Sequence, residues 1–233
     1  MIDTLEYIYD RWQIDRKTPS PIEVGRSREG ALPFLINRLG FQVGAEVGVE
    51  RGFFSKLICL SCPNFKLYSV DAWENYDEYG DYIGLDLPEI YKHAKERLTP
   101  LKNCQMVKGY SMDVVKRFAD ESLDFVYIDA NHGYKNVAED IRAWSRKVRK
   151  GGIIAGHDYN PPTPHTIWKV KKLKLRKYFE DVYAVKRAVD DWVKEENISP
   201  LFVLTKIHCR SWFVVKTWDT PINNTPKKKF LPV

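Results

Sequence analysis

The sequence contains no apolar run that approaches the roughly 20 residues needed to span a bilayer. Residues 1–6 also lack the basic and apolar segments that characterise a secretory signal peptide. We therefore expect a cytoplasmic protein that does not insert into a membrane.

The four cysteines do not form the pattern of a disulfide framework or of a common zinc site. Cys59 and Cys62 are spaced as C-x-x-C, but Cys104 and Cys209 do not supply the second pair that such a zinc site needs. Cys59 falls on the apolar face of a predicted helix, so we interpret it as a core residue in a reducing compartment.

Two common nucleotide-binding patterns are also absent, namely a glycine-rich loop ending in Gly-Lys-Ser/Thr and the spacing G-x-G-x-x-G. The pattern that is present is Glu46-x-Gly48-x-x-x-Gly52-x-x-Ser55, which interrupts an apolar run and precedes residues at helical spacing. Glycines permit positive φ and let a ligand approach bare backbone at the positive end of a helix. The motif therefore predicts a nucleotide-type binding loop between a strand and a helix.

The chain has 233 residues, 44% of them hydrophobic and 29% charged, which fits one large domain. Six cations, equal in number to the net charge of +6, fall within residues 169–177. A basic stretch can attract nucleic acid or an acidic substrate. Because no aromatic stacking pattern accompanies these cations, we interpret the stretch as a solvated insertion and do not expect a nucleic-acid partner.

Strand and helix patterns alternate along most of the chain. Strands are predicted over 45–49, 67–71, 105–108, 122–129 and 153–156, followed by two closely spaced strands over 201–205 and 211–215. Helices are predicted over 2–12, 31–39, 53–59, 90–98, 137–148 and 182–192, with a further one beginning at Ser111. This alternation is typical of an α/β fold with a doubly wound, mostly parallel sheet and an antiparallel last strand.

The chemically active residues follow the ends of the predicted strands. Ligands of doubly wound sheets bind beyond the carboxyl ends of the strands. Gly48 to Gly52, Asp71, Ser111, residues 129–132 and residues 157–158 follow the first to the fifth strand in turn. Their common place at one edge predicts a nucleotide-type ligand site.

Several stretches together resemble the class I S-adenosylmethionine-dependent methyltransferases, in the branch of small-molecule and sugar O-methyltransferases. The stretches that carry the resemblance are 46–48, 68–73, 123–134, 140–144, 151–159 and 185–190. The resemblance implies a seven-stranded sheet, S-adenosylmethionine as cofactor, and transfer of a methyl group to a hydroxyl of a small molecule or sugar. The helical spacing and the polar composition of the last residues, together with the resemblance, predict N-terminal helices packed on the core (1–40), a methyltransferase domain (41–218) and a loose C-terminal tail (219–233).

The resemblance assigns donor-binding roles by position. Its motif covers Glu46, Gly48, Gly52 and Ser55, and Asp129 is a further expected cofactor residue. Asp71 matches the acid that holds the ribose hydroxyls, although it could instead cap a turn. Trp73 is expected against the adenine or in packing, and Ser111 near the adenine or at a helix N-cap.

Asp129, His157 and Asp158 occupy the places where metal-dependent relatives hold a cation, which implies Mg²⁺ or Mn²⁺. His157 departs from the oxygen ligands of those relatives. Because adjacent residues of an extended strand face opposite ways, His157 and Asp158 can share an ion only where the strand has ended. Asp129 and His132 are the expected catalytic residues, with His132 at the position of the family's base. His132 could instead form a hydrogen bond within its loop or simply be exposed.

Two other functions remain open from the sequence. One is an oxidoreductase that binds NAD or a nucleotide sugar on the same sheet, and the other is a non-catalytic module that binds RNA through residues 169–177. The loop over 73–86 and the basic stretch are expected to shape the choice of acceptor, which the sequence does not identify.

Overall fold

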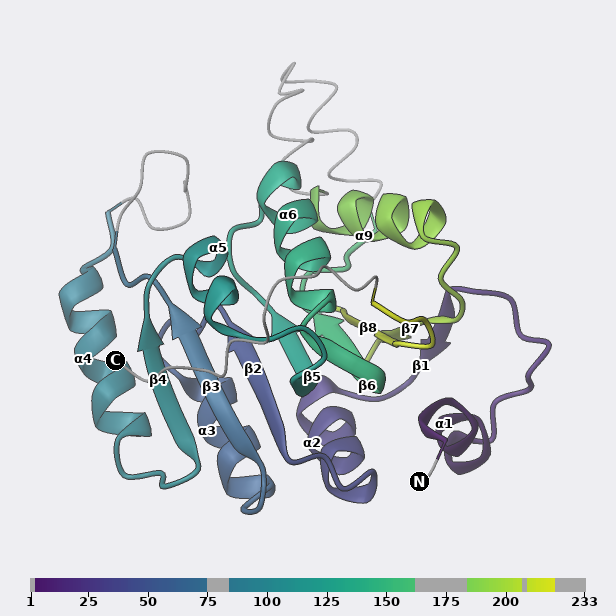
Figure 1. The fold of residues 1–233 in the computed structure, drawn as a ribbon, viewed down its shortest axis with the longest axis horizontal. Helices are drawn as coiled ribbons and strands as arrows, with labels where there is room; N and C mark the ends of the chain where they lie inside the picture. The colour runs from purple at the N-terminus through teal and green to yellow at the C-terminus, as the bar shows by residue number, and fades with distance from the viewer. Residues whose placement is uncertain (1–2, 75–83, 162–183, 207–208, 221–233) are drawn as a thin grey trace.

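The computed structural model describes residues 3–74, 84–161, 184–206 and 209–220 (Figure 1). Within these ranges, eight strands form one sheet in the order β1-β7-β8-β6-β5-β2-β3-β4. The strands are β1 Ile22–Val24, β2 Val43–Val47, β3 Lys66–Asp71, β4 Cys104–Lys108, β5 Leu123–Ile128, β6 Val148–Gly156, β7 Leu201–Leu204 and β8 Ser211–Val215. All neighbours are parallel except β8, which is antiparallel to β6 and β7. The predicted α/β class and the antiparallel last strand are confirmed.

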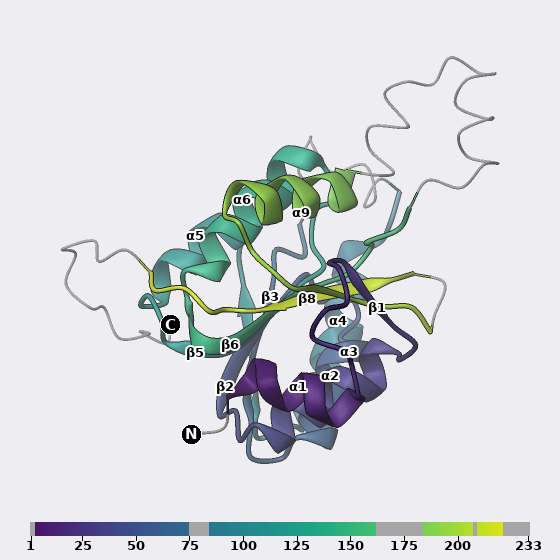
Figure 2. The same ribbon diagram turned by 90° about the vertical axis from the view of Figure 1, so that its right-hand side faces the viewer.

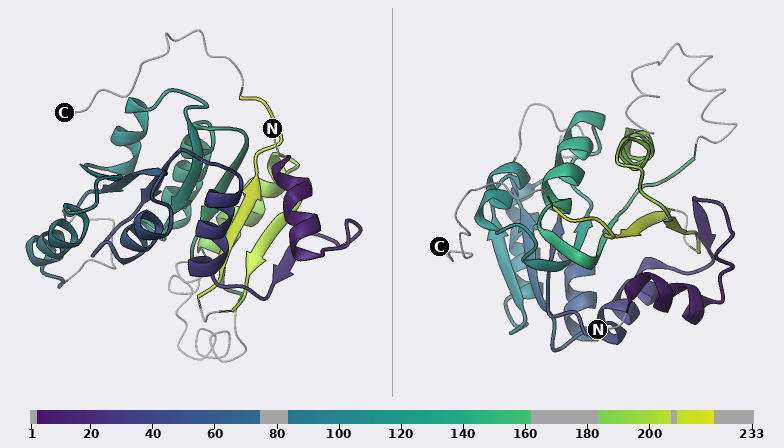
Figure 3. Two further views of the ribbon diagram at one scale, coloured as in Figure 1. Left: turned by 90° about the horizontal axis from the view of Figure 1, so that it is seen from below. Right: turned by 45° about the vertical axis from the view of Figure 1, so that its right-hand side comes forward.

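Helices cover both faces of the sheet (Figure 2). One face carries α1 Thr4–Trp12, α2 Arg28–Arg38 and α3 Phe53–Ser61, with α4 Leu87–Leu98 packed against α3. The other carries α5 Ser111–Val114, the 3₁₀ helix η2 Val115–Arg117, α6 Tyr134–Ser145 and α9 Ala184–Glu195. The helix α1 lies over β7 and β8 (Figure 3). Tyr9 and Trp12 of this helix contact Phe202 of β7 edge-on.

Alternate residues of β5 face the two layers of helices. Phe125 and Tyr127 pack in the cluster under α2 and α3, whereas Val126 and Ile128 pack in the cluster under α6 and α9. A strand repeats its side-chain direction every two residues. Asp129, directly after the strand, therefore continues on the side of Tyr127, toward α2.

The sheet contains one strand more than the seven expected. Strand β1 adds an edge by pairing in parallel with β7, where Ile22 faces Phe202 in the register. Its three residues follow Pro19 and Pro21, and a run so short next to prolines carries too little periodicity to indicate a strand. The N-terminal segment thus contributes to the sheet as well as packing helices on it.

The boundary between α6 and β6 also differs from the expectation. The helix ends at Ser145 and the strand begins at Val148, so Gly151 and Gly152, which precede the expected strand over 153–156, lie inside β6. A Cβ at Gly152 would lie 2.5 Å from the carbonyl oxygen of Asp124. Glycine is needed there because β6 passes so close to β5, where the register shifts.

The basic stretch over 169–177 lies outside the described residues, as do most of the 73–86 loop and the tail beyond residue 220. In the described part of the chain, no helix has both the length and the apolar character required to cross a membrane.

Candidate active site

The carboxyl ends of β2, β3, β4 and β5, together with the first turns of α6, enclose a pocket of about 740 Å³. Of the expected donor-binding residues, Gly48, Asp71 and Ser111 line the pocket. The lining also includes Val47, Val70, Ala72, Gly109, Tyr110, Met112, Ala130, Asn131, Asn136, Glu139 and Asp140.

Gly48 and Gly52, the two glycines of the motif, lie where neighbouring segments approach too closely for a side chain. At Gly48, where φ is 89°, a Cβ would lie 1.9 Å from the carbonyl oxygen of Asp129. Gly52, with φ of 76°, is the N-cap of α3, and a Cβ there would press on Leu98. Gly48 therefore lets the end of β2 lie against the end of β5, and Gly52 lets α3 begin beside α4.

The carboxylate of Asp71 organises the loop that follows β2. One oxygen accepts from the backbone N–H groups of Val49 and Glu50, at 2.8 and 2.9 Å, and the other accepts from Trp73 N–H at 2.8 Å. The side chain is buried and also lines the pocket. Asp71 thus fixes the glycine loop to the end of β3 and presents its carboxylate beside the pocket.

Glu46 and Ser55 lie beneath this loop and are not among the pocket-lining residues. The Ser55 hydroxyl donates to the Glu46 carboxylate and lies 2.7 Å from the Ser69 hydroxyl, and all three side chains are buried. Burial raises the pKa of Glu46 to about 8, against the hydrogen bond from Ser55, which favours the charged form. The Glu46 carboxyl is therefore mostly protonated at neutral pH.

The structure places Trp73 in a packing cluster away from the pocket lining. Its indole N–H donates to the Glu50 carbonyl at 2.8 Å, and its ring centroid lies 4.9 Å from that of Tyr91. Trp73 has a φ of 44°, and this conformation turns the chain after Asp71.

Ser111 joins β4 to α6. It is the first residue of α5, whose N-cap is Tyr110, so its hydroxyl does not cap the helix. The hydroxyl instead donates to Asp140 and accepts from the Trp144 indole at 2.8 Å. Burial raises the pKa of Asp140 to about 6, against the hydrogen bond from Ser111. Asp140 was not predicted as a site residue, because nothing in its helical pattern separates it from a surface acid.

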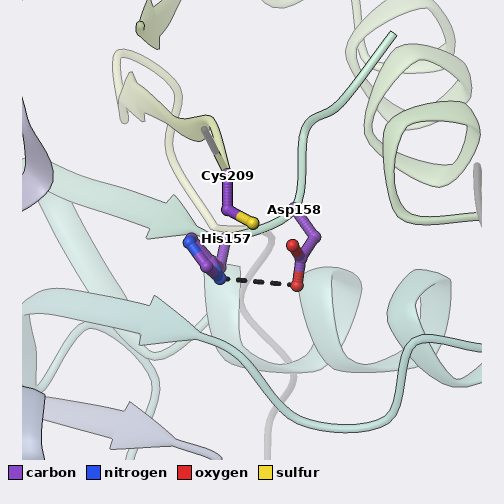
Figure 4. Close-up of side chains that lie close together, drawn as sticks. All are labelled: His157, Asp158 and Cys209. Atoms are coloured by element: carbon purple, nitrogen blue, oxygen red, sulfur yellow. Dashed lines mark ion pairs between the residues drawn. The ribbon is translucent and has the colours of Figure 1, made fainter. Parts of the chain in front are cut away.

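Four ionisable side chains meet where β5 and β6 end. His132 Nε2 lies 3.1 Å from Asp158 Oδ2 and 3.6 Å from Asp129 Oδ1. His157 Nδ1 lies 3.4 Å from Asp158 Oδ2 (Figure 4) and 3.5 Å from Asp129 Oδ2, which the figure does not draw. Strand β6 ends at Gly156, and Asp158 has a φ of 56°. This turn brings two adjacent side chains to one centre, which an extended strand would prevent.

The pairing of these groups controls their protonation. Burial alone would lower the pKa of each imidazole, but hydrogen bonds to Asp129 and Asp158 raise it to about 11 for His132 and about 9 for His157. Burial would likewise raise the pKa of each carboxyl, yet the imidazoles lower that of Asp129 to about 2 and that of Asp158 further. His132 is therefore cationic at neutral pH in this arrangement, because two carboxylates hold its proton.

Arg28 brings a fifth charged group from the start of α2. Its Nη1 lies 2.6 Å from the hydroxyl of Tyr127 and 3.2 Å from Oδ2 of Asp129, and the guanidinium sits 4.8 Å from the ring centroid of Phe54. Burial would lower the pKa of Arg28, but its hydroxyl and carboxylate partners raise it. Sequence analysis missed Arg28, and the only signal was that Tyr127 and Asp129 share one strand face.

The donor atoms of these residues can form two overlapping metal-binding sets that share Asp158. One set is Asp129, His132 and Asp158, and the other is His157, Asp158 and Cys209 (Figure 4), with ligand atoms within 4.8 Å of one another in each. The Nε2 of His157 is buried and has no hydrogen-bond partner in the described part of the chain. Carboxylate and imidazole donors together suit a divalent transition-metal ion.

Comparisons with known proteins agree with this arrangement. Residues 45–159 match a family model described as a methyltransferase domain. Over 130 residues, the chain is 20% identical to an uncharacterised protein, y4gI, of Sinorhizobium fredii. The match covers 54% of this chain and only 14% of that protein, so the chain spans about a seventh of its length.

Solved structures share the fold across nearly the whole chain. An O-methyltransferase from Bacillus cereus in complex with SAH gives a TM-score of 0.56 at 16% identity, covering 93% of this chain and 92% of that one. The O-methyltransferase TomG from Streptomyces achromogenes, in complex with SAM, gives 0.56 at 12% identity, covering 93% and 91%. The SAH-bound methyltransferase PaMTH1 of Podospora anserina gives 0.56 at 11% identity, covering 93% and 89%. The predicted resemblance to class I methyltransferases is confirmed.

Proposed function

Residues 45–159 match the model of a methyltransferase domain, and the chain shares its fold with solved O-methyltransferases; from these likenesses we propose the reaction. The chain transfers the methyl group of S-adenosylmethionine to a hydroxyl group of a small molecule or sugar. A divalent cation held at the end of β5 and β6 assists the transfer.

One observation carries this proposal: the loop that follows β5 borders both the pocket and the ionisable cluster. Ala130 and Asn131 line the pocket, while Asp129 and His132 belong to the cluster. A donor in the pocket and an acceptor at the cluster would thus be separated by one short loop. Transfer of a methyl group needs this proximity, because the acceptor oxygen must approach in line with the breaking C–S bond.

Residues that line the pocket would bind the donor. The carboxylate of Asp71 would accept a hydrogen bond from a ribose hydroxyl. The adenine would lie beside Ser111, whose hydroxyl donates to Asp140. Glu46 and Ser55 would act from below by supporting the glycine loop, since neither lines the pocket.

The cation would be held by the carboxylates of Asp129 and Asp158 together with the imidazole of His157, whose Nδ1 lies 3.5 and 3.4 Å from them. Mixed oxygen and nitrogen donors favour Mn²⁺ or a similar transition-metal ion over Mg²⁺, which prefers oxygen ligands alone. When bound, such an ion would lower the pKa of the acceptor hydroxyl and orient it.

His132 would take up the proton of the acceptor hydroxyl. With the two carboxylates engaged elsewhere, its pKa would fall toward the ordinary value, and Nε2 could accept that proton. The acceptor oxygen would then bond to the methyl carbon as the C–S bond breaks, leaving neutral S-adenosylhomocysteine.

Calorimetric titration of the full chain with S-adenosylhomocysteine and with NAD⁺ tests the proposal. Binding of S-adenosylhomocysteine without NAD⁺ is expected, followed by transfer of label from S-adenosylmethionine to hydroxyl acceptors in a panel. Binding of NAD⁺ alone would favour an oxidoreductase on the same sheet and overturn the proposal.

A further inference from the structure

A second cavity, open to solvent, lies beside the start of α2. Three cations from separate segments line it: Arg11 of α1, Arg26 after β1, and Lys206 after β7. No carboxylate is among the lining residues, which also include Trp12, Val24, Gly25, Ser27, Gly30, Ala31 and Phe34. We refer to this space as the cationic cavity.

The charges of the cationic cavity are not neutralised within the described residues. Neither Arg11, Arg26 nor Lys206 forms an ion pair there, in contrast to Arg16, Arg149 and Arg210, which pair with carboxylates at 2.5 to 2.7 Å. Three like charges that share one concave space repel each other and raise the local positive potential. Such a space favours a negatively charged ligand.

Aromatic rings hold two of these cations at the cavity wall. The guanidinium of Arg26 lies 5.4 Å from the ring centroid of Trp12, and that of Arg11 lies 5.3 Å from the ring centroid of Phe34. Cation–π contacts restrain the guanidinium planes without satisfying their N–H donors. The backbone N–H of Lys206 donates to the Arg26 carbonyl at 3.2 Å and keeps these two segments together.

The cationic cavity lies on the acceptor side of the ionisable cluster. The cluster follows β5 and β6, the donor pocket extends the other way over β2, β3 and β4, and the cavity follows β1 and β7. The first turn of α2 joins them, because Arg28 contacts Asp129 while Ser27 and Gly30 line the cavity. With strands spaced about 4.8 Å apart, β7 and β1 lie about 10 to 14 Å from β6.

We propose that the cationic cavity binds an anionic group of the methyl acceptor, a carboxylate or a phosphate, about 10 to 14 Å from the hydroxyl that is methylated. The proposal rests on the methyltransferase function stated above. The cationic cavity would select acceptors that carry an acidic group far from the reacting hydroxyl. The guanidinium groups of Arg11 and Arg26 suit oxyanions that accept two hydrogen bonds at once.

The test is calorimetric titration of the full chain with inorganic pyrophosphate and, separately, with citrate. Binding of either probe is expected, and the double variant Arg11→Gln/Arg26→Gln should weaken it at least about tenfold. Arg38→Gln is the matched control, because Arg38 lies 5.8 Å from the same Phe34 ring yet does not line the cavity. Comparing the affinities for pyrophosphate and for citrate shows whether the cationic cavity prefers a phosphate or a carboxylate.

Three results would overturn the proposal. They are no binding of either probe to the wild type at millimolar concentration, equal weakening by Arg38→Gln, and binding of an oligothymidine without binding of either small anion. Titration of the wild type and of each variant with S-adenosylhomocysteine distinguishes a failure of the methyltransferase function from a failure of the anion site. If the wild type does not bind S-adenosylhomocysteine, the proposed methyltransferase function is wrong. Unchanged affinity for S-adenosylhomocysteine in the double variant would show that this variant has kept its fold.

Discussion

The Arg28 guanidinium lies 3.2 Å from the Asp129 carboxylate, although 101 residues separate them in the chain. Arg28 opens α2, which belongs to the N-terminal segment, whereas Asp129 follows β5 in the centre of the sheet. The arginine also contacts the hydroxyl of Tyr127, which lies 3.2 Å from the Ser211 hydroxyl. The N-terminal segment therefore supplies part of the charged centre as well as covering the sheet.

We predict that Arg28→Gln lowers turnover at least about tenfold while donor affinity changes less than about twofold, because Asp129 loses the cation that fixes its direction. Arg28→Lys keeps the charge but cannot bridge Tyr127 and Asp129, so an intermediate rate is expected. The control is Arg16→Gln, an exposed cation paired with Glu6. Equal losses of turnover and of S-adenosylhomocysteine affinity would contradict a role at Asp129.

Replacing Asp71 by Ala should weaken binding of S-adenosylhomocysteine about 10- to 100-fold in calorimetry. It should also lower stability, because three backbone N–H groups lose their acceptor. Asp86→Ala is the control: Asp86 caps α4 by accepting from Glu89 N–H, and its loss should cost about 1 kcal/mol without changing donor affinity. Unchanged affinity in a folded Asp71→Ala protein would remove Asp71 from the donor site.

Gly48→Ala and Gly40→Ala separate steric clash from backbone strain. Both glycines have positive φ, 89° and 66°, so alanine is strained at each. A Cβ at Gly48 would meet the Asp129 carbonyl oxygen at 1.9 Å, whereas one at Gly40 would meet nothing within 4 Å. Urea unfolding should therefore show Gly48→Ala less stable than Gly40→Ala by at least about 2 kcal/mol. Equal stabilities would mean that β2 and β5 can move apart without cost.

Most of the sheet could be predicted from the sequence, because β2, β3 and β5 are buried runs of β-forming residues that end in glycines or acids. Strand β1 could not, since a three-residue edge strand is defined by its pairing with β7 and not by its own pattern. The start of β6 was obscured by Gly151 and Gly152, which resemble a helix stop until their distance to β5 is known.

The site was predictable where a residue lies directly after a strand. Asp129 follows β5 directly and Asp71 is the last residue of β3, and the end of a parallel strand places such side chains at the ligand-binding edge. Arg28 and Asp140 lie on helices, and only the tertiary packing of α2 and α6 brings them to the centre. The protonation of His132 was also beyond the sequence, because it depends on Asp158, which approaches through a turn with positive φ.

Asp158→Asn should weaken Mn²⁺ binding at least about tenfold, because Asp158 belongs to both candidate metal-binding sets and a neutral amide is a poorer ligand. Calorimetry or electron paramagnetic resonance of free Mn²⁺ would measure the change. Asp113→Asn, which removes an exposed carboxylate from α5, is the control. Full turnover of the wild type after exhaustive chelation would rule out the cation and leave donor binding intact.

The last prediction concerns how stability depends on pH through Glu46. Its side chain is buried, and burial raises the folded-state pKa to about 8 from the ordinary value of 4.5. Between these values the folded state binds a proton that the unfolded state has released. The contribution of Glu46 to the free energy of unfolding is therefore fully present below about pH 4.5. It falls by about 1.4 kcal/mol per pH unit as pH rises toward 8 and then levels off.

Glu46→Gln isolates this contribution, because the amide keeps an acceptor for the Ser55 hydroxyl but does not titrate. Urea unfolding at pH 5, 6, 7 and 8 should show a flatter profile for the variant, and the stability of the wild type relative to the variant should fall as pH rises from 5 to 8. Asp140 and the other titrating groups are common to both proteins, so their contributions cancel in that difference. Parallel profiles over this range would mean that Glu46 is ionised in the folded protein, and its burial would then need a compensating cation.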